Sequence, residues 1–183
     1  MKIIDKIGYL KTRRRAVKPH TVVLHHTAGG SLGGAEVTLR QRGLGYHYMI
    51  DKDGSIIKYG DPLRYMSHSY RRNTGTIGVS YVGGQDTRHG ATPRQITSIK
   101  TLLKHLEKTI PSVTKVTGHK HIDPRTKHVS HPYKVDPTWI GDSPRGYVTG
   151  NNWDNDLMHM EEIARDTGLE FVSELFPSRK KGY

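Results

Sequence analysis

Residues 21–28 read TVVLHHTA, a short apolar run that ends in two histidines. Residues 21–24 have the β-branched and apolar composition of a strand, and the glycine-rich segment 29–34 stops that strand. His25 and His26 therefore lie at a strand end beside a loop, where imidazoles can face a cleft. We interpret the rest of the chain around this strand end.

A β-hairpin is expected further along the chain. Two β-rich runs, GYHYMI at 45–50 and SIIKYG at 55–60, are separated by a turn that contains Lys-Asp-Gly. Because side chains alternate along a strand, the first run should divide its side chains between two faces. One face would receive Tyr46, Tyr48 and Ile50, and the other His47 and Met49.

Further elements complete a mixed α/β pattern. Thr92 can cap, and Pro93 can open, a helix whose apolar residues repeat at three- and four-residue spacing as far as Pro111. We also expect a short basic helix at 35–42, strands at 77–82 and 113–119, and a closing helix at about 156–176. This pattern predicts the α/β class, with a single mixed central β-sheet flanked by helices in one domain of residues 1–183.

Charge is the strongest signal in the composition. The chain has 29 Lys and Arg against 17 Asp and Glu, a formal net charge of +12, which attracts nucleic acid, anionic membranes and anionic cell-wall polymers. Residues 1–20 include Arg13, Arg14 and Arg15, and we expect an exposed arm or first loop there, with a nucleic-acid contact as the alternative. No nucleic-acid-binding signature accompanies the charge, so nucleic acid is not the expected partner.

Two absences narrow the possible chemistry and location. The chain has no cysteine, which excludes disulfides, a cysteine-liganded zinc knuckle and a thiol nucleophile. No stretch approaches the roughly 20 apolar residues of a membrane span. Charged residues interrupt the N-terminal sequence MKIIDKIGYLKTRRR, so we expect no secretory signal peptide. The expectation is a protein made in the cytoplasm that needs another factor to leave it.

The chain contains 12 histidines, and many of them are clustered in the sequence. They include His25, His26, His47, His68, His119, His121, His128 and His131. A lone histidine is more often a surface or core residue than a ligand. Clusters at predicted strand ends change that balance, because catalytic zinc takes three protein ligands and one water, whose acidity the metal raises. No HExxH motif is present, so the residues alone indicate a histidine zinc site of another kind.

Five strings in a fixed order carry a resemblance to a known family. They are VVLHHTAGG, GYHYMIDKDGSI, SHS followed by NTGTIGVSYVGG, TPRQITSIKTLL and TGHKHIDP. Together they resemble the zinc-dependent N-acetylmuramoyl-L-alanine amidases of the type-2 family, which include small phage endolysins and peptidoglycan-recognition proteins (PGRPs). The similarity runs from about residue 20 to 132. It implies a type-2 amidase (PGRP-like) fold, with a core at about 20–135 and a C-terminal extension at 137–183 that carries a helix.

The resemblance implies the ligands of a Zn²⁺ ion residue by residue. His25, the first histidine of the strand-end pair, and His119, which follows Thr-Gly, match family ligands. The third family ligand is a Cys or Asp directly before a proline, and His131 occupies that position here. A site of three histidines is therefore expected. The loop between the second and third ligands is longer than in the common pattern, so His121 and His128 remain alternatives.

The resemblance also implies catalytic residues. Tyr46 matches a family tyrosine near the zinc, whose phenol can donate to a developing oxyanion; the alternative is a hairpin tyrosine packed on the core. Val129 stands where many members have a lysine, which leaves Lys127 as the expected cation. Ser80 stands where other members carry a glutamate base, so proton transfer falls to Tyr46, Lys127 or a histidine such as His68.

Three further residues match positions that contact substrate in the family: His26, His68 and Asn73. The alternative for His26 is a packing role. For His68 and Asn73 the alternative is the ordering of a loop.

The resemblance implies a peptidoglycan hydrolase of the endolysin type. Such an enzyme cleaves the amide bond between N-acetylmuramic acid and the L-alanine of the stem peptide during phage-induced host lysis. Bacterial peptidoglycan is then the partner, with electrostatic contact to the anionic cell envelope, and we expect a monomer that reaches the wall through a holin pore. Two other classes stay open: a PGRP-like module that binds muropeptide without cutting it, and a basic nucleic-acid-binding protein whose histidines are incidental.

Overall fold

The computed structural model describes residues 1–69, 71–84, 91–119, 160 and 162–172. Within these residues the centre of the fold is a seven-stranded sheet of order β1-β5-β4-β7-β3-β8-β9. Its strands are β1 (Ile3–Asp5), β3 (Thr21–His26), β4 (Tyr48–Ile50), β5 (Ile56–Lys58), β7 (Thr76–Tyr81), β8 (Lys115–Gly118) and β9 (Glu170–Phe171). Neighbouring strands are parallel except β4 and β5, which form the predicted hairpin. The predicted mixed central sheet of an α/β fold is confirmed.

Strand β3, which carries the TVVLHH sequence, lies between β7 and β8 in the sheet. Its register with β7 runs from Thr21 opposite Thr76 to His26 opposite Tyr81. All residues of β3 and β7 are buried. Near-continuous burial is typical of parallel strands that are covered on both faces, and it explains why the apolar run of β3 shows no polar alternation.

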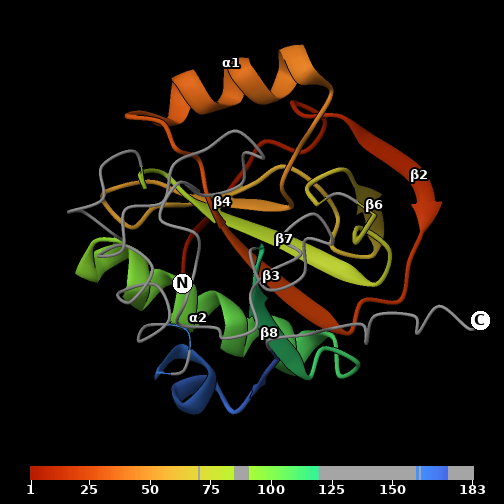
Figure 1. The fold of residues 1–183 in the computed structure, drawn as a ribbon, viewed down its shortest axis with the longest axis vertical. Coiled ribbons are helices and arrows are strands. Elements are labelled where there is room, and N and C mark those ends of the chain that lie inside the picture. Colours follow the sequence, from red (N-terminus) through yellow and green to blue (C-terminus); the bar gives the residue numbers. More distant parts are fainter. Residues whose placement is uncertain (70, 85–90, 120–159, 161, 173–183) are drawn as a thin grey trace, which may run out of the picture.

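Two helices cover the two faces of the sheet (Figure 1). Helix α2 (Pro93–Thr109) packs on one face, in a core that includes Val22, Leu24, Tyr48, Ile50, Val79, Ile99, Leu102 and Val116. Helix α1 (Leu32–Arg42) packs on the opposite face, in a smaller core that includes Leu10, Ala35, Tyr46, Met49, Ile57, Tyr59 and Met66. The side chains of a central strand therefore point alternately toward the α2 side and the α1 side of the sheet.

The capping residues set where the helices begin. Thr92 and Gln95 form a capping box at the start of α2. Thr92 is thus the N-cap and Pro93 the first helical residue, as predicted. The Gln95 amide also donates to the carbonyl oxygens of Ile50 and Val82, at 3.1 and 2.9 Å, and so joins α2 to two strand ends. Ser31 caps α1 by accepting from Gly34 N–H. No helix in the described part of the chain combines the length and hydrophobicity that a membrane span needs.

The N-terminal segment is more ordered than the exposed arm or first loop that was expected. Strand β1 pairs in parallel with β5 at one edge of the main sheet. Strand β2 (Thr12–Ala16) pairs with β6 (Arg64–Met66) in a separate antiparallel ribbon. Both strands are short and largely exposed, so they carry little of the apolar alternation that marks a strand in sequence.

The predicted face of Tyr46 is wrong. Tyr46 packs with Met49 in the smaller core beside α1, whereas Tyr48 and Ile50 pack in the larger core beside α2. The reason is that β4 begins only at Tyr48, so strand alternation does not extend back to Tyr46. This error matters, because the α1 side of the sheet also carries the side chain of His25.

The closing helix is shorter than predicted. Residues 160 and 162–167 are helical, and Gly168, at φ 73°, follows the last of them. A left-handed glycine is a common helix terminator. The chain then enters β9, which pairs in parallel with β8, so the predicted continuation of the helix toward residue 176 is wrong. The beginning of the predicted helix, at 156–159, lies outside the described residues.

His47 has a structural role in joining the hairpin to the sheet. Its side chain is fully buried; Nδ1 accepts from Gly78 N–H at 2.9 Å, and Nε2 lies 2.9 Å from the Arg64 carbonyl oxygen. A neutral ring protonated on Nε2 satisfies both contacts. Burial lowers the pKa of His47 from its ordinary value of 6.5 to about 4, so the folded protein keeps this ring neutral.

This lowered pKa predicts a loss of stability in mild acid. Below pH 6.5 the unfolded chain takes up a proton on His47 that the folded chain refuses, so the free energy of unfolding falls as the pH drops toward 4. The expected contribution of His47 is about 3 kcal/mol between neutral pH and pH 4. Urea unfolding at several pH values should show a shallower pH dependence for His47→Asn than for the wild type. Equal slopes for the two proteins would contradict this assignment.

Candidate functional site

His25 and His119 meet on the α1 side of the sheet because of the strand register. Leu24 of β3 lies opposite Gly118, the last residue of β8, and the next residue along the chain is a histidine in both cases. The centroids of the two imidazole rings are 4.7 Å apart, and the ring planes are inclined by 50°. Both side chains are buried, with 3% and 5% of their surface exposed. Two residues separated by more than ninety positions in the sequence thus form one pair of nitrogen donors.

Tyr46 and Ser80 lie beside this histidine pair. The ring centroid of Tyr46 is 4.7 Å from that of His25. Ser80 is the β7 residue opposite His25, and its side chain is fully buried. Tyr46, which was predicted to be catalytic, is therefore both a core residue and a neighbour of the predicted ligand His25. Its packing in the core is thus compatible with a place beside the metal site.

His68 contacts His25 directly. His68 Nδ1 lies 3.1 Å from His25 Nε2, and His68 Nε2 lies 3.2 Å from Thr76 Oγ1. Burial lowers the pKa of His68 well below 6.5, and its neighbours His25, His47 and His119 lower it further. The ring is therefore neutral at neutral pH and is placed to hold His25 by a hydrogen bond.

His26 packs on Tyr81 and Gly84. Its ring lies 6.1 Å from that of Tyr81, and its Nδ1 accepts from Ala28 N–H at 3.2 Å. The ring packs so closely on Gly84 that a Cβ there would lie 2.4 Å from Nδ1. His26 nevertheless lines the groove described below, so it combines a packing role with access to a bound molecule.

Asn73 orders the loop that carries His68. Its side-chain oxygen accepts from the N–H groups of His68 and Ser69, at 2.8 and 2.6 Å, and its amide donates to Tyr65 Oη at 2.9 Å. Asn73 also lines the groove. Asn73 thus orders the loop, and its place in the groove wall also gives it access to a bound molecule.

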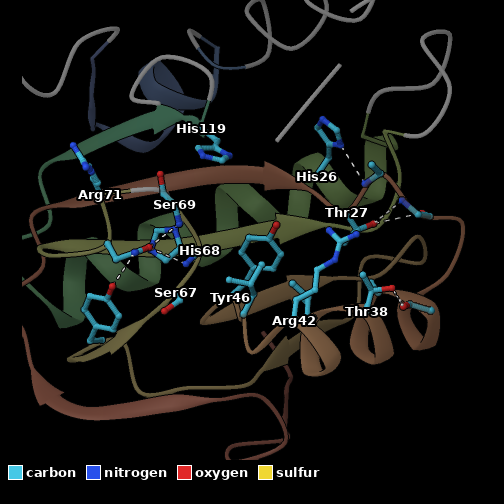
Figure 2. A pocket seen from close by; sticks show the side chains of 18 of the residues that line it. His26, Thr27, Thr38, Arg42, Tyr46, Ser67, His68, Ser69, Arg71 and His119 are labelled. Atoms are coloured by element: carbon cyan, nitrogen blue, oxygen red, sulfur yellow. Dashed lines mark hydrogen bonds between the residues drawn. The ribbon is translucent and has the colours of Figure 1, made fainter. Parts of the chain in front are cut away.

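A groove of about 1140 Å³ opens in front of these residues. His26, Tyr46, His68 and His119 line its sheet side, and Figure 2 shows them around one hollow. Helix α1 forms another wall along its whole length, through its N-cap Ser31 and through Gly34, Ala35, Thr38, Leu39 and Arg42. Three arginines also line the groove: Arg15, Arg42 and Arg71. The groove is thus large, and its lining carries positive charge.

Several predicted residues lie outside the described residues. They are the third ligand His131, its alternatives His121 and His128, and the predicted catalytic Lys127. Within the described residues no group of three His, Cys, Asp or Glu side chains is placed to hold a metal ion. A site with three protein ligands therefore needs one ligand from the remaining residues.

The described pair suits zinc by the chemistry of its donors. Neutral imidazole nitrogen is a preferred zinc ligand, and catalytic sites combine such donors with an open position. The rings of His25 and His119 lie side by side at the end of two parallel strands, and His119 lines the groove from which a substrate would approach. His25 has a hydrogen-bonding neighbour in His68, as metal-binding histidines usually have.

Sequence reasoning missed two residues that shape the site. Gly78 lies under the ring of His68, where a Cβ would lie 2.6 Å from Cγ. Thr76 supplies the hydroxyl that contacts His68 Nε2. The glycine inside the strand was a usable signal, since glycine within a strand often marks a close approach of another group. No local signal pointed to Thr76.

Comparison with known families identifies residues 15–137 as a match to the profile of the N-acetylmuramoyl-L-alanine amidases. An endolysin of Enterobacteria phage T3 is 38% identical over 64 residues, which are 33% of this chain and 42% of that protein. A putative N-acetylmuramoyl-L-alanine amidase of Rickettsia conorii is 27% identical over 112 residues, which are 57% of this chain and 42% of that protein. The matches thus span about half or less of these relatives.

Solved structures share the fold at low sequence identity. The amidase LysC from Clostridium intestinale is 22% identical, with a TM-score of 0.64, and the match covers 93% of this chain and 99% of that one. The Drosophila peptidoglycan recognition protein SD is 19% identical, with a TM-score of 0.53 and coverage of 68% and 86%. These two likenesses support the predicted type-2 amidase (PGRP-like) fold. Because the family profile matches more than half of its residues, the chain belongs to the N-acetylmuramoyl-L-alanine amidase family.

Proposed function

We propose that this chain is a zinc-dependent peptidoglycan hydrolase that cleaves the amide bond between N-acetylmuramic acid and the L-alanine of the stem peptide. The observation that carries the proposal is the pair of buried imidazoles, His25 and His119, beside the ring of Tyr46. Family membership supports the reaction class, and the volume of the groove supports a large substrate.

His25, His119 and His131 would hold the zinc ion. When bound, zinc supplies a Lewis acid for the scissile carbonyl and a water of raised acidity. The chain supplies positioning: the groove aligns the stem peptide, and the hydrogen bond between His25 and His68 orients His25. His26 and Asn73 line the same groove and would contact the substrate.

Tyr46 would stabilise charge on the substrate. Its ring is fixed against His25 and packed in the core beside α1, so its phenol can donate a hydrogen bond to the carbonyl oxygen as negative charge develops there. Lys127 would add a cation and deliver a proton to the departing amine. Ser80, opposite His25, offers no carboxylate base on β7, so the proton that the attacking water loses would have to pass through Tyr46 or Lys127 to the departing amine.

The biological role follows from the relatives. Proteins of phages T3, K11 and T7 that match part of this chain carry the name endolysin. We infer that this enzyme acts in phage-induced host lysis, as a monomer made in the host cytoplasm and released to the wall through a holin pore. A PGRP-like module that binds muropeptide without cutting it is the second candidate, and the structural likeness to a peptidoglycan recognition protein supports it.

Replacement of either described histidine should abolish zinc binding and activity together. We expect the purified wild type to hold one zinc ion per chain, and His25→Ala and His119→Ala to lose both the metal and the ability to reduce the turbidity of cell-wall suspensions. His105→Ala, at an exposed position on α2, is the matched control and should keep both. Zinc retained at full stoichiometry in His25→Ala and His119→Ala would contradict the proposal. Zinc binding without amide cleavage would favour the recognition module.

The third ligand can be assigned by the same metal analysis. Of the three single variants His121→Ala, His128→Ala and His131→Ala, only His131→Ala should lose zinc and wall lysis. If His131→Ala keeps both while one of the other two loses them, the ligand assignment moves to that residue.

Tyr46→Phe should separate charge stabilisation from packing. The variant keeps the ring that fills the core but lacks the hydroxyl, so kcat on a soluble muropeptide should fall by about 100-fold while zinc content and Tm stay near wild type. Tyr48→Phe is the control, because Tyr48 is a buried tyrosine of the same hairpin that packs on the α2 side of the sheet. A Tyr46→Phe enzyme with wild-type kcat would rule out this role for the phenol.

The arginines of β2 are proposed to hold the enzyme on the anionic wall. Arg13, Arg14 and Arg15 are exposed, and Arg15 lines the groove, so this ribbon extends positive charge away from the site. Arg13→Gln/Arg14→Gln should weaken binding to cell walls at low salt more than at high salt and leave kcat on soluble muropeptide unchanged. Lys104→Gln/Lys108→Gln, on exposed positions of α2, makes the same charge change elsewhere. Equal loss of wall binding in both double variants would contradict a specific role for β2.

A further inference from the structure

A chain of hydrogen bonds leads from a backbone carbonyl to His25. Thr76 Oγ1 donates to the Arg72 carbonyl oxygen at 2.7 Å. The same oxygen lies 3.2 Å from His68 Nε2, and His68 Nδ1 lies 3.1 Å from His25 Nε2. Thr76 is fully buried, and His25 and His68 are exposed by only 3% and 8%. These hydrogen bonds are therefore largely shielded from water molecules that could compete for the same donors and acceptors.

The direction of this chain follows from counting protons. A threonine hydroxyl has one proton, and here it goes to the Arg72 carbonyl, so Thr76 Oγ1 can only accept from His68 Nε2–H. A neutral His68 that is protonated on Nε2 has its lone pair on Nδ1. That nitrogen must accept, so His25 donates from Nε2–H. A neutral His25 that is protonated on Nε2 has its own lone pair on Nδ1.

Contacts with the surrounding strands and loop hold this chain of hydrogen bonds in place. The ring of His68 lies against Gly78 of β7, where a Cβ would come within 2.6 Å of Cγ, so the absence of a side chain makes room for the ring. Asn73 accepts from the backbone N–H of His68 at 2.8 Å and fixes the start of its loop. Thr76 is the first residue of β7, the central strand of the sheet, and lies opposite Thr21 of β3. None of these contacts depends on a bound molecule.

We propose that His68 and Thr76 are positioning residues that hold His25 as the Nε2–H tautomer, so that Nδ1 is the nitrogen that binds the metal. This inference rests on the proposed function for its metal, but the tautomer belongs to the protein alone. In this arrangement His68 orients a metal ligand, and other residues transfer protons to or from the substrate. Thr76 acts through His68, and the Arg72 carbonyl sets the direction.

The test reads the tautomer and the zinc affinity separately. Nitrogen-15 to proton correlation spectra of the imidazoles, recorded on zinc-free protein at pH about 8 and assigned with His25→Ala, should show His25 protonated on Nε2. Thr76→Val keeps the shape of the side chain but removes the hydroxyl. This variant should give mixed tautomers at His68 and His25. It should also raise the zinc Kd, measured by competition with a chelating dye, by about 10- to 100-fold.

Two controls distinguish positioning from general packing. Thr76→Ser restores the hydroxyl and should restore both the tautomer and the zinc affinity. Thr21→Val removes the hydroxyl of the fully buried threonine on the neighbouring strand, which lies 2.7 Å from His20 Nδ1, and should leave both unchanged.

Each outcome decides the inference. A wild-type His25 protonated on Nδ1 in the zinc-free protein would overturn it, whether or not zinc binds. A Thr76→Val protein that is folded and keeps the wild-type tautomers and zinc Kd would also overturn it. If the wild type binds no zinc, the proposed function fails, while the spectra still decide whether the hydrogen-bond chain holds His25 in this form.

Discussion

The parallel register of β3 with β7 and β8 is the constraint on which the rest of the structure depends. It places the residue after Leu24 beside the residue after Gly118, and both are histidines. The same register places Ser80 opposite His25 and Thr76 opposite Thr21. A shift of one residue would move every side chain to the other face of the sheet. His25 would then point toward α2, and the pair of imidazoles would not exist.

The two faces of the sheet have divided roles. The α2 face is a continuous apolar core that stabilises the strands, and its helix is joined to two strand ends by Gln95. The α1 face holds a smaller core at one side and the polar histidine cluster at the other. Buried imidazoles need hydrogen-bonding partners, and on this face His47 and His68 find them in backbone groups and in Thr76. The larger core and the histidine cluster thus share strands without sharing a face.

Local sequence patterns correctly predicted three elements of the fold. The β3 strand, the hairpin and the helix at Pro93 were correct because their periodicity and caps act within a few residues. The strand pairing of the first 16 residues was missed, since β1 and β2 are short and exposed. The face of Tyr46 was wrong, because it depends on where β4 begins. The bond between His68 and His25 joins residues 43 positions apart and has no local signature.

The proposed reaction depends on the binding of one metal ion by both His25 and His119. Anomalous diffraction at the zinc absorption edge, measured on crystals of the purified protein, can locate this ion. We expect a single strong anomalous peak about 2.0–2.1 Å from a ring nitrogen of each of these two histidines. A well-ordered structure from zinc-loaded protein in which the peak lies elsewhere, or touches only one of the two rings, would contradict it.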